Sequence, residues 1–110
     1  MSVSTHVLDA SLGTPAAGIA VTLSAVTRMG ADDAAAVVEA GATDADGRCR
    51  FGAEVPAGAY RLTFATGPYF TARAVDAFYP EVTITFTVTS GHFHVPLLLS
   101  PFAYSTYRGS

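Results

Sequence analysis

The clearest pattern in the chain is the stretch EVTITFTVT at residues 81–89, in which apolar and polar side chains alternate. Successive side chains on a strand point to opposite faces, so one face of this segment is apolar and the other carries threonines. Similar short segments recur between turn-forming stretches such as LGTPAAG, DADG and VPAG. The pattern predicts strands at about residues 4–10, 18–28, 36–43, 47–52, 58–66, 81–89, 92–99 and 103–109.

One segment departs from this period of two. In GPYFTARAVDAFYP, at residues 67–80, Pro68 lies where a helix can begin, and Phe70, Ala74 and Ala77 follow at helical spacing. Pro80 cannot continue a helix, so we expect one short helix that ends before it. Eight strands and one helix predict an all-β sandwich of two sheets, with residues 1–110 as a single domain.

The connections and edges of this sandwich can also be anticipated. The TSG turn at residues 89–91 is expected to join the strands on either side of it as a hairpin. The strand at residues 81–89 has no lysine and no interior proline to protect it as a sheet edge. We therefore expect it to pair with a second copy of the chain, and two such dimers to pack together.

Composition narrows the function classes. Half of the residues are hydrophobic, only 14% are charged, and the net charge is −3 without any basic run. These values argue against nucleic acid or an anionic membrane as a partner. There is no apolar stretch of membrane-spanning length and no leader pattern, and the single cysteine, Cys49, cannot form an intrachain disulfide. A cytoplasmic location fits best, with Cys49 more plausible as a packed strand residue than as a nucleophile between Arg48 and Arg50.

The three histidines are the first candidates for chemistry. His92 and His94 lie two residues apart and share one face of a predicted strand, and His6 lies near the start of the chain. Any one of them alone is most simply a surface or hydrogen-bonded residue. Together they could hold zinc with an open fourth position, because H-x-H on a strand is a known ligand spacing.

Acid–base catalysis without a metal is the alternative. Imidazole titrates near neutral pH, and an arginine beside it could stabilise an anion. The stretch TDADGRCRF supplies Arg48 after a D-x-D-G turn. Arg48 could equally be the solvated flank of a simple turn.

Four stretches resemble the 5-hydroxyisourate hydrolases, the transthyretin-related enzymes of urate catabolism. They are THVLD, TDADGRCRF, FYPEVTITF and the final HFHVPLLLSPFAYSTYRGS, and together they cover essentially the whole chain in order. The terminal YRGS is the most specific, since it distinguishes the enzymes from transthyretin, the hormone-carrying relative. The resemblance implies a transthyretin-like sandwich assembled as a homotetramer, a dimer of dimers.

The resemblance also implies roles for individual residues. The family's catalytic residues fall on His6, Arg48, His94 and Ser110, with His6, Arg48 and Tyr107 binding substrate. His92 is not one of the family's core catalytic positions. The expected reaction is hydrolysis of the cyclic amide in the six-membered ring of 5-hydroxyisourate, with no metal or other cofactor. Ser110 and its carboxylate are expected to help close a site shared between two dimers.

Two other functions stay open on the sequence alone. One is a carrier that binds a small aromatic ligand, as transthyretin does. The other is a zinc hydrolase that uses the three histidines as ligands.

Overall fold

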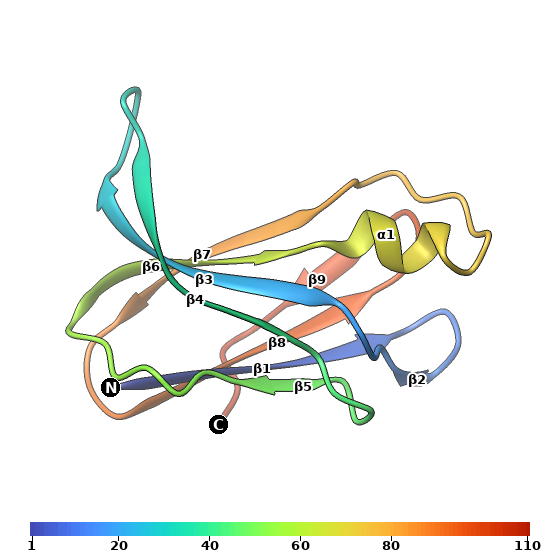
Figure 1. Ribbon diagram of the computed structural model, residues 1–110, viewed down its shortest axis with the longest axis horizontal. Helices are drawn as coiled ribbons and strands as arrows, with labels where there is room; N and C mark the ends of the chain where they lie inside the picture. The colour runs from blue at the N-terminus through green and yellow to red at the C-terminus, as the bar shows by residue number, and fades with distance from the viewer.

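Two β-sheets pack face to face in the computed structural model, which describes all residues from Met1 to Ser110 (Figure 1). One sheet has the strand order β2-β1-β8-β9, with β5 also paired to β1, and the other has the order β4-β3-β6-β7. The elements are β1 (Ser2–Asp9), β2 (Thr14–Pro15), β3 (Ala20–Arg28), β4 (Ala34–Ala42), β5 (Arg48–Arg50), β6 (Gly58–Phe64), α1 (Thr66–Thr71), β7 (Val82–Val88), β8 (His92–Leu99) and β9 (Tyr104–Thr106). The predicted all-β sandwich is confirmed.

Alternating side chains form the core between the sheets. In β1 every second residue from Val3 to Asp9 is buried, while the residues between them are half-buried on the outer face. In β7, Val82 and Val88 are buried and the threonines are exposed, as the alternation predicted. The apolar faces together form one cluster of 20 buried residues, which both sheets share.

The first and eighth strands lie side by side and run in the same direction. Ser2 pairs with His92, Ser4 with His94 and Asp9 with Leu99, over the full length of both strands. On the other side of β1, the short strand β5 runs antiparallel and places Arg48 opposite His6. Three segments far apart in the sequence therefore form one continuous outer face.

One local prediction is wrong, and the helix, although present and ending before Pro80 as expected, is shorter than its spacing indicated. The turn at residues 89–91 does not close a hairpin, because β7 belongs to one sheet and β8 to the other, so this turn carries the chain between sheets. The helix ends at Thr71 instead of continuing toward Pro80. Pro80 folds back on the start of the helix and accepts a 2.9 Å hydrogen bond from the Gly67 N–H, and Ala74 has a positive φ of 55°. The helical spacing of Ala74 and Ala77 thus falls in an irregular loop.

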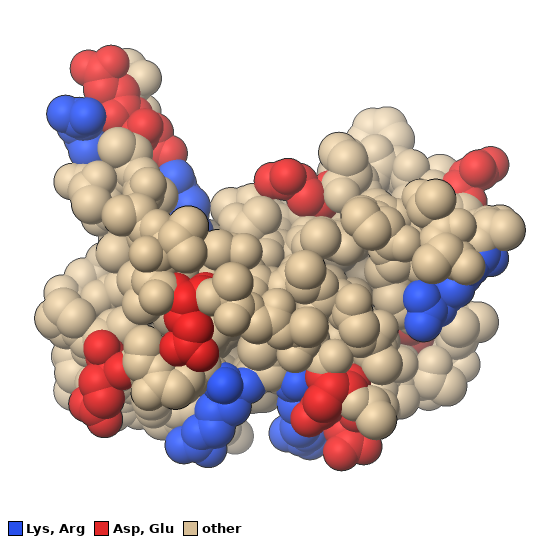
Figure 2. Space-filling view, in the orientation of Figure 1, with Lys and Arg blue, Asp and Glu red and all other residues tan.

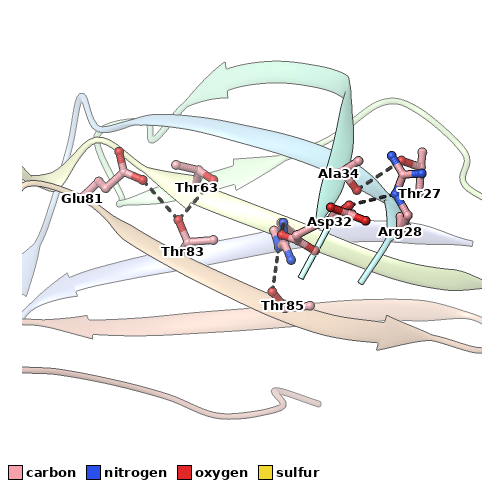
Figure 3. A network of polar contacts seen from close by, with 10 residues as sticks. Thr27, Arg28, Asp32, Ala34, Thr63, Glu81, Thr83 and Thr85 are labelled. Carbon is pink, nitrogen blue, oxygen red and sulfur yellow. Dashed lines mark hydrogen bonds and ion pairs between the residues drawn. The ribbon is translucent and has the colours of Figure 1, made fainter. Parts of the chain in front are cut away.

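A β3–β4 hairpin projects from the second sheet (Figure 1), and polar contacts around its base and along β6 and β7 form a network (Figure 3). The Arg61 guanidinium on β6 forms an ion pair with Asp33 in the hairpin loop, and Arg61 Nε donates to Thr85 Oγ1 at 3.0 Å. The Arg61 hydrogen bond holds the pKa of Asp33 below its usual 3.8. This exposed network lies on the sheet opposite the face formed by β5, β1 and β8.

Asp9 is the one carboxylate buried among the core residues. Its Oδ1 accepts hydrogen bonds from the Ser11 and Leu12 N–H groups and from Ser11 Oγ, and its Oδ2 accepts one of 2.8 Å from Tyr69 Oη. Burial raises the pKa of Asp9, but the hydrogen bonds from Ser11, Tyr69 and Leu12 outweigh it, so the pKa lies below 3.8. The network joins the end of β1 to α1.

Charged groups are sparse on the face seen in Figure 2, and acidic and basic atoms gather together on the projecting hairpin. Elsewhere large apolar side chains are exposed, including Phe78 at 69% and Phe102 at 67%. Phe78, Tyr79 and Tyr104 stack edge to face with centroids 4.9 and 5.2 Å apart. No helix has the length and apolar character that a membrane crossing requires.

Candidate functional site

A polar pocket of about 290 Å³ opens on the outer face of β5, β1 and β8. Its lining contains arginine, histidine and serine side chains and no acidic side chain; the lining residues are Ser4, Thr5, Arg48, Cys49, Arg50, His92, His94 and Ser110. His6 lies next to it on the same face of β1, opposite Arg48. The structure therefore brings together His6, Arg48, His94 and Ser110 from both ends and the middle of the chain.

The DADG turn fixes the position of Arg48. Asp44 Oδ1 accepts hydrogen bonds from the Asp46 and Arg48 N–H groups at 2.9 and 3.0 Å. Gly47 has a φ of 75°, and a Cβ there would lie 2.4 Å from the Val7 carbonyl oxygen, so only glycine fits this approach to β1. The turn predicted from the sequence is present, and Arg48 leaves it as part of the pocket wall.

The same turn orients His6. The Asp46 carbonyl oxygen lies 2.9 Å from His6 Nε2, and a carbonyl can only accept a hydrogen bond, so Nε2 carries a proton. In the neutral ring Nδ1 is then the nitrogen with a free lone pair. The turn thus positions both Arg48 and His6.

His94 is held as a neutral imidazole. Burial lowers the pKa of His94 below its usual 6.5, and repulsion from His6, Arg48 and His92 lowers it further. A ring that stays unprotonated near pH 7 can accept a proton, which is what a general base requires.

Two neighbours fix the orientation of the His94 ring. On one side Ser4 Oγ lies 2.8 Å from His94 Nδ1. On the other side the Gly109 N–H donates to the His94 carbonyl oxygen at 2.8 Å, and a Cβ on Gly109 would lie 2.5 Å from His94 Cδ2. The tail of the chain packs against the imidazole, and no side chain could occupy that contact.

His92 takes part in hydrogen bonds at both ring nitrogens. Its Nδ1 lies 2.6 Å from Ser2 Oγ and its Nε2 lies 2.8 Å from Ser4 Oγ. Because Ser4 also contacts His94, the four side chains from Ser2 to His94 form one hydrogen-bonded chain. Within it, His92 is exposed and His94, at the inner end, is half-buried.

Tyr107 does not line the polar pocket. It is 59% exposed and lies on a neighbouring crevice of about 270 Å³, which it shares with His94, Phe93 and Arg108. The Arg108 guanidinium stacks over the Phe93 ring, 4.7 Å from its centroid, and anchors the tail. His94 lies between the pocket and this crevice.

The three histidines do not converge on one point. No group of three or more His, Cys, Asp or Glu side chains is arranged to hold a metal ion. His92 bonds to serines at both nitrogens and His6 Nε2 bonds to a carbonyl. This geometry does not support the three-histidine zinc site considered from the sequence.

Two parts of the pocket wall were missed by the sequence reasoning. Arg50 lies opposite Ser4 and lines the pocket, and its guanidinium, like that of Arg48, has no hydrogen bond or ion pair within the chain. Arg50 could have been found, because residues two apart on a strand share a face. Ser4 could not, because its contact with His94 depends on the pairing of β1 with β8.

Cys49 also belongs to the pocket lining, but its chemistry is that of a packed residue. It is 8% exposed. Burial raises the pKa of its thiol, and the charges of Glu39 and Asp44 raise it too, which disfavours the reactive thiolate.

The sequence model described as the HIUase/Transthyretin family matches residues 3–109. A 5-hydroxyisourate hydrolase of Deinococcus radiodurans is 46% identical over 115 residues, which span 96% of this chain and 93% of that protein. The solved structure of Klebsiella pneumoniae 5-hydroxyisourate hydrolase superposes with a TM-score of 0.85 at 39% identity, over 99% of this chain and 93% of the other. The crystal structure of transthyretin from Sparus aurata gives 0.86 at 34% identity, over 97% and 95%.

Proposed function

Because the chain belongs to the HIUase/Transthyretin family, we propose that it hydrolyses the cyclic amide in the six-membered ring of 5-hydroxyisourate. The product of that ring opening is 2-oxo-4-hydroxy-4-carboxy-5-ureidoimidazoline, which places the reaction in urate degradation. The observation that carries the proposal is the pocket itself, in which a neutral, oriented His94 lies beside Arg48 and Ser110. This is a set of groups suited to acyl hydrolysis and not to passive binding of an apolar ligand.

His94 and His6 activate water in this proposal. With Nδ1 bonded to Ser4, His94 has Nε2 left for a water molecule, and His6 has Nδ1 left. One imidazole accepts the proton of the attacking water, and the other takes the remaining hydroxyl proton of the tetrahedral intermediate and passes it to the nitrogen that leaves the acyl carbon. Holding both on one rigid sheet removes most of the orientational cost of the step.

Arg48 recognises and stabilises the substrate. A guanidinium offers paired N–H donors that match the oxygen-rich edge of the heterocycle, and it stabilises the negative charge that grows on the carbonyl oxygen. Arg48 is exposed on the pocket wall and has no internal partner, so its donors are free for a ligand. Arg50 extends this positive surface in a protein whose net charge is −3.

The tail residues complete the site. Ser110 lines the pocket directly and is proposed to position substrate or water. Tyr107 lies beside the other edge of His94 and is proposed to contact substrate across that ring.

We propose that the working form is a homotetramer, a dimer of dimers. β7 and β9 are sheet edges, and neither has another strand paired on its outer side. Phe78, Phe102 and Tyr107 are more than half exposed, and burial against further copies would remove this apolar area from water. Light scattering at micromolar concentration tests this assembly, and a stable monomer would contradict it.

We also propose that residues 1–110 act as a single catalytic domain in the cytoplasm. One core of 20 buried residues joins both sheets, and Cys49 is an unpaired thiol that a reducing compartment preserves. Cell fractionation with an antibody to the protein tests the location.

The decisive experiment follows the ultraviolet absorbance of freshly generated 5-hydroxyisourate. The protein should accelerate its decay above the spontaneous rate, and the acceleration should survive exhaustive chelation, since the proposed groups are imidazole and guanidinium. No acceleration, together with tight binding of a small aromatic ligand, would favour the carrier function of a transthyretin. Loss of activity on chelation, restored by zinc, would favour a zinc hydrolase.

A further inference from the structure

We propose that Ser2, His92 and Ser4 form a proton relay that connects His94 to solvent. The relay is the unbroken row of contacts from Ser2 Oγ to His92 Nδ1 at 2.6 Å, from His92 Nε2 to Ser4 Oγ at 2.8 Å and from Ser4 Oγ to His94 Nδ1 at 2.8 Å. All three are short, direct hydrogen bonds, and no gap in the row needs a bridging water.

The strand register builds this row. In the parallel pairing of β1 with β8, Ser2 lies opposite His92 and Ser4 opposite His94. Residues two apart on each strand share a face, so two serines and two histidines alternate across the strand pair. The row meets water at His92, which is exposed, and its inner end is the half-buried His94.

Every member of the row can both donate and accept a proton. A serine hydroxyl does so at one oxygen, and a neutral imidazole does so through its two nitrogens. When His94 takes a proton from water at Nε2, its Nδ1 proton passes to Ser4 Oγ. The Ser4 proton passes to His92 Nε2, and the Nδ1 proton of His92 leaves to Ser2 or water. Each group ends neutral, and one proton has reached solvent.

The proposed reaction releases a proton that has to leave the pocket, so this inference rests on the proposed function. Water adds to the acyl carbon, the C–N bond breaks, and the products are a carboxylic acid and a ureido nitrogen. The acid ionises at neutral pH and the ureido nitrogen is not basic, so each turnover releases one proton. The guanidinium groups of Arg48 and Arg50 line the pocket at the inner end, and their positive charge disfavours keeping that proton beside His94.

The test separates proton transfer from packing. In His92→Gln the amide can still bond to both serines but cannot carry a proton, so kcat should fall about tenfold with little change in KM, less than the loss for a direct acid or base. His92→Ala should lose a similar factor and recover when imidazole is added. Ser4→Ala should also lose activity and Ser4→Thr should keep it, while Ser90→Ala, an exposed serine of the neighbouring turn, is the matched control. Full activity of His92→Gln, or no rescue of His92→Ala by imidazole, would overturn the relay.

A second measurement does not depend on turnover. Nitrogen-15 shifts of the substrate-free protein should place a proton on His94 Nδ1, and Ser4→Ala should move it toward Nε2. If the wild-type protein does not accelerate 5-hydroxyisourate decay, the proposed function is wrong. The nitrogen-15 shifts still test the relay in that case, because they do not depend on turnover. A His94 ring whose nitrogen shifts do not respond to Ser4→Ala would overturn it independently.

Discussion

Replacing Gly109 by alanine should disable the proposed site while leaving the sandwich folded. The added Cβ would lie 2.5 Å from His94 Cδ2 and 3.2 Å from His94 Cβ and Cγ. Non-bonded carbon atoms settle about 3.5–4.0 Å apart, so the ring and the tail must separate by about 1 Å. Neither partner moves freely, because Ser4 holds the ring and a 2.8 Å backbone hydrogen bond ties Gly109 to His94.

The expected loss follows from that displacement. A misplacement of about 1 Å in a positioned group can cost about 100-fold in rate. That factor corresponds to about 2.7 kcal/mol in the activation barrier, at about 1.36 kcal/mol for each factor of ten. Gly109 lies outside the buried core, so the free energy of unfolding should change by no more than about 0.5 kcal/mol.

The assay is the initial rate of 5-hydroxyisourate decay above the spontaneous rate, with thermal melts and oligomer size recorded for each variant. Gly52→Ala is the matched control, because a Cβ there meets no atom within 4 Å and φ is not positive. It should behave as the wild type. A Gly109→Ala protein that turned over substrate at the normal rate would refute the view that the tail positions His94.

Three further predictions concern the tail, the pH profile and the core. Deleting Tyr107–Ser110 should lower the rate about 100-fold, because the groups proposed to position substrate and His94 are lost, while melts should show a much smaller effect on stability. Because the pKa of His94 is lowered, the acid limb of kcat/KM should lie below pH 6.5, and Arg48→Gln should shift it to higher pH by removing repulsion; a limb that does not move would contradict this cause. Tyr69→Phe should reduce the free energy of unfolding by about 1–3 kcal/mol in denaturant titrations, because it leaves an oxygen of the buried Asp9 without its partner; unchanged stability would contradict it.

The sandwich could be predicted because apolar and polar residues alternate along its strands, and this alternation is visible in the sequence alone. The alternation from Val82 to Val88 indicates which face of the strand points toward the core, without any knowledge of the element packed against it. The alternation does not indicate which of the two sheets a strand belongs to. The turn at residues 89–91 has the residues of a hairpin turn, but only the packing of both sheets decides that β7 and β8 separate there.

Short elements and long-range contacts also escaped prediction. The two-residue strand β2 is too short to leave a pattern. The end of α1 is followed by a turn in which Ala74 has a φ of 55° and the Val75 N–H donates to the Phe70 carbonyl oxygen, which spacing along the chain cannot reveal. The histidines and Arg48 were candidates from their chemistry, and resemblance to a family added their roles and the tail residues. The contact of Ser4 with His94 required knowing that β1 and β8 run parallel.

The pairing of β1 with β8 has a consequence for how the molecule folds. The contacts that assemble the pocket join residues 88 to 90 positions apart, whereas β3 and β4 meet through a short loop. Closing a loop of that length costs about 2 kcal/mol more chain entropy than closing one of about ten residues. Proteins dominated by such distant pairings have a high contact order and fold slowly. After dilution from denaturant, enzyme activity should therefore return with the slowest phase of refolding, after the β3–β4 hairpin has formed.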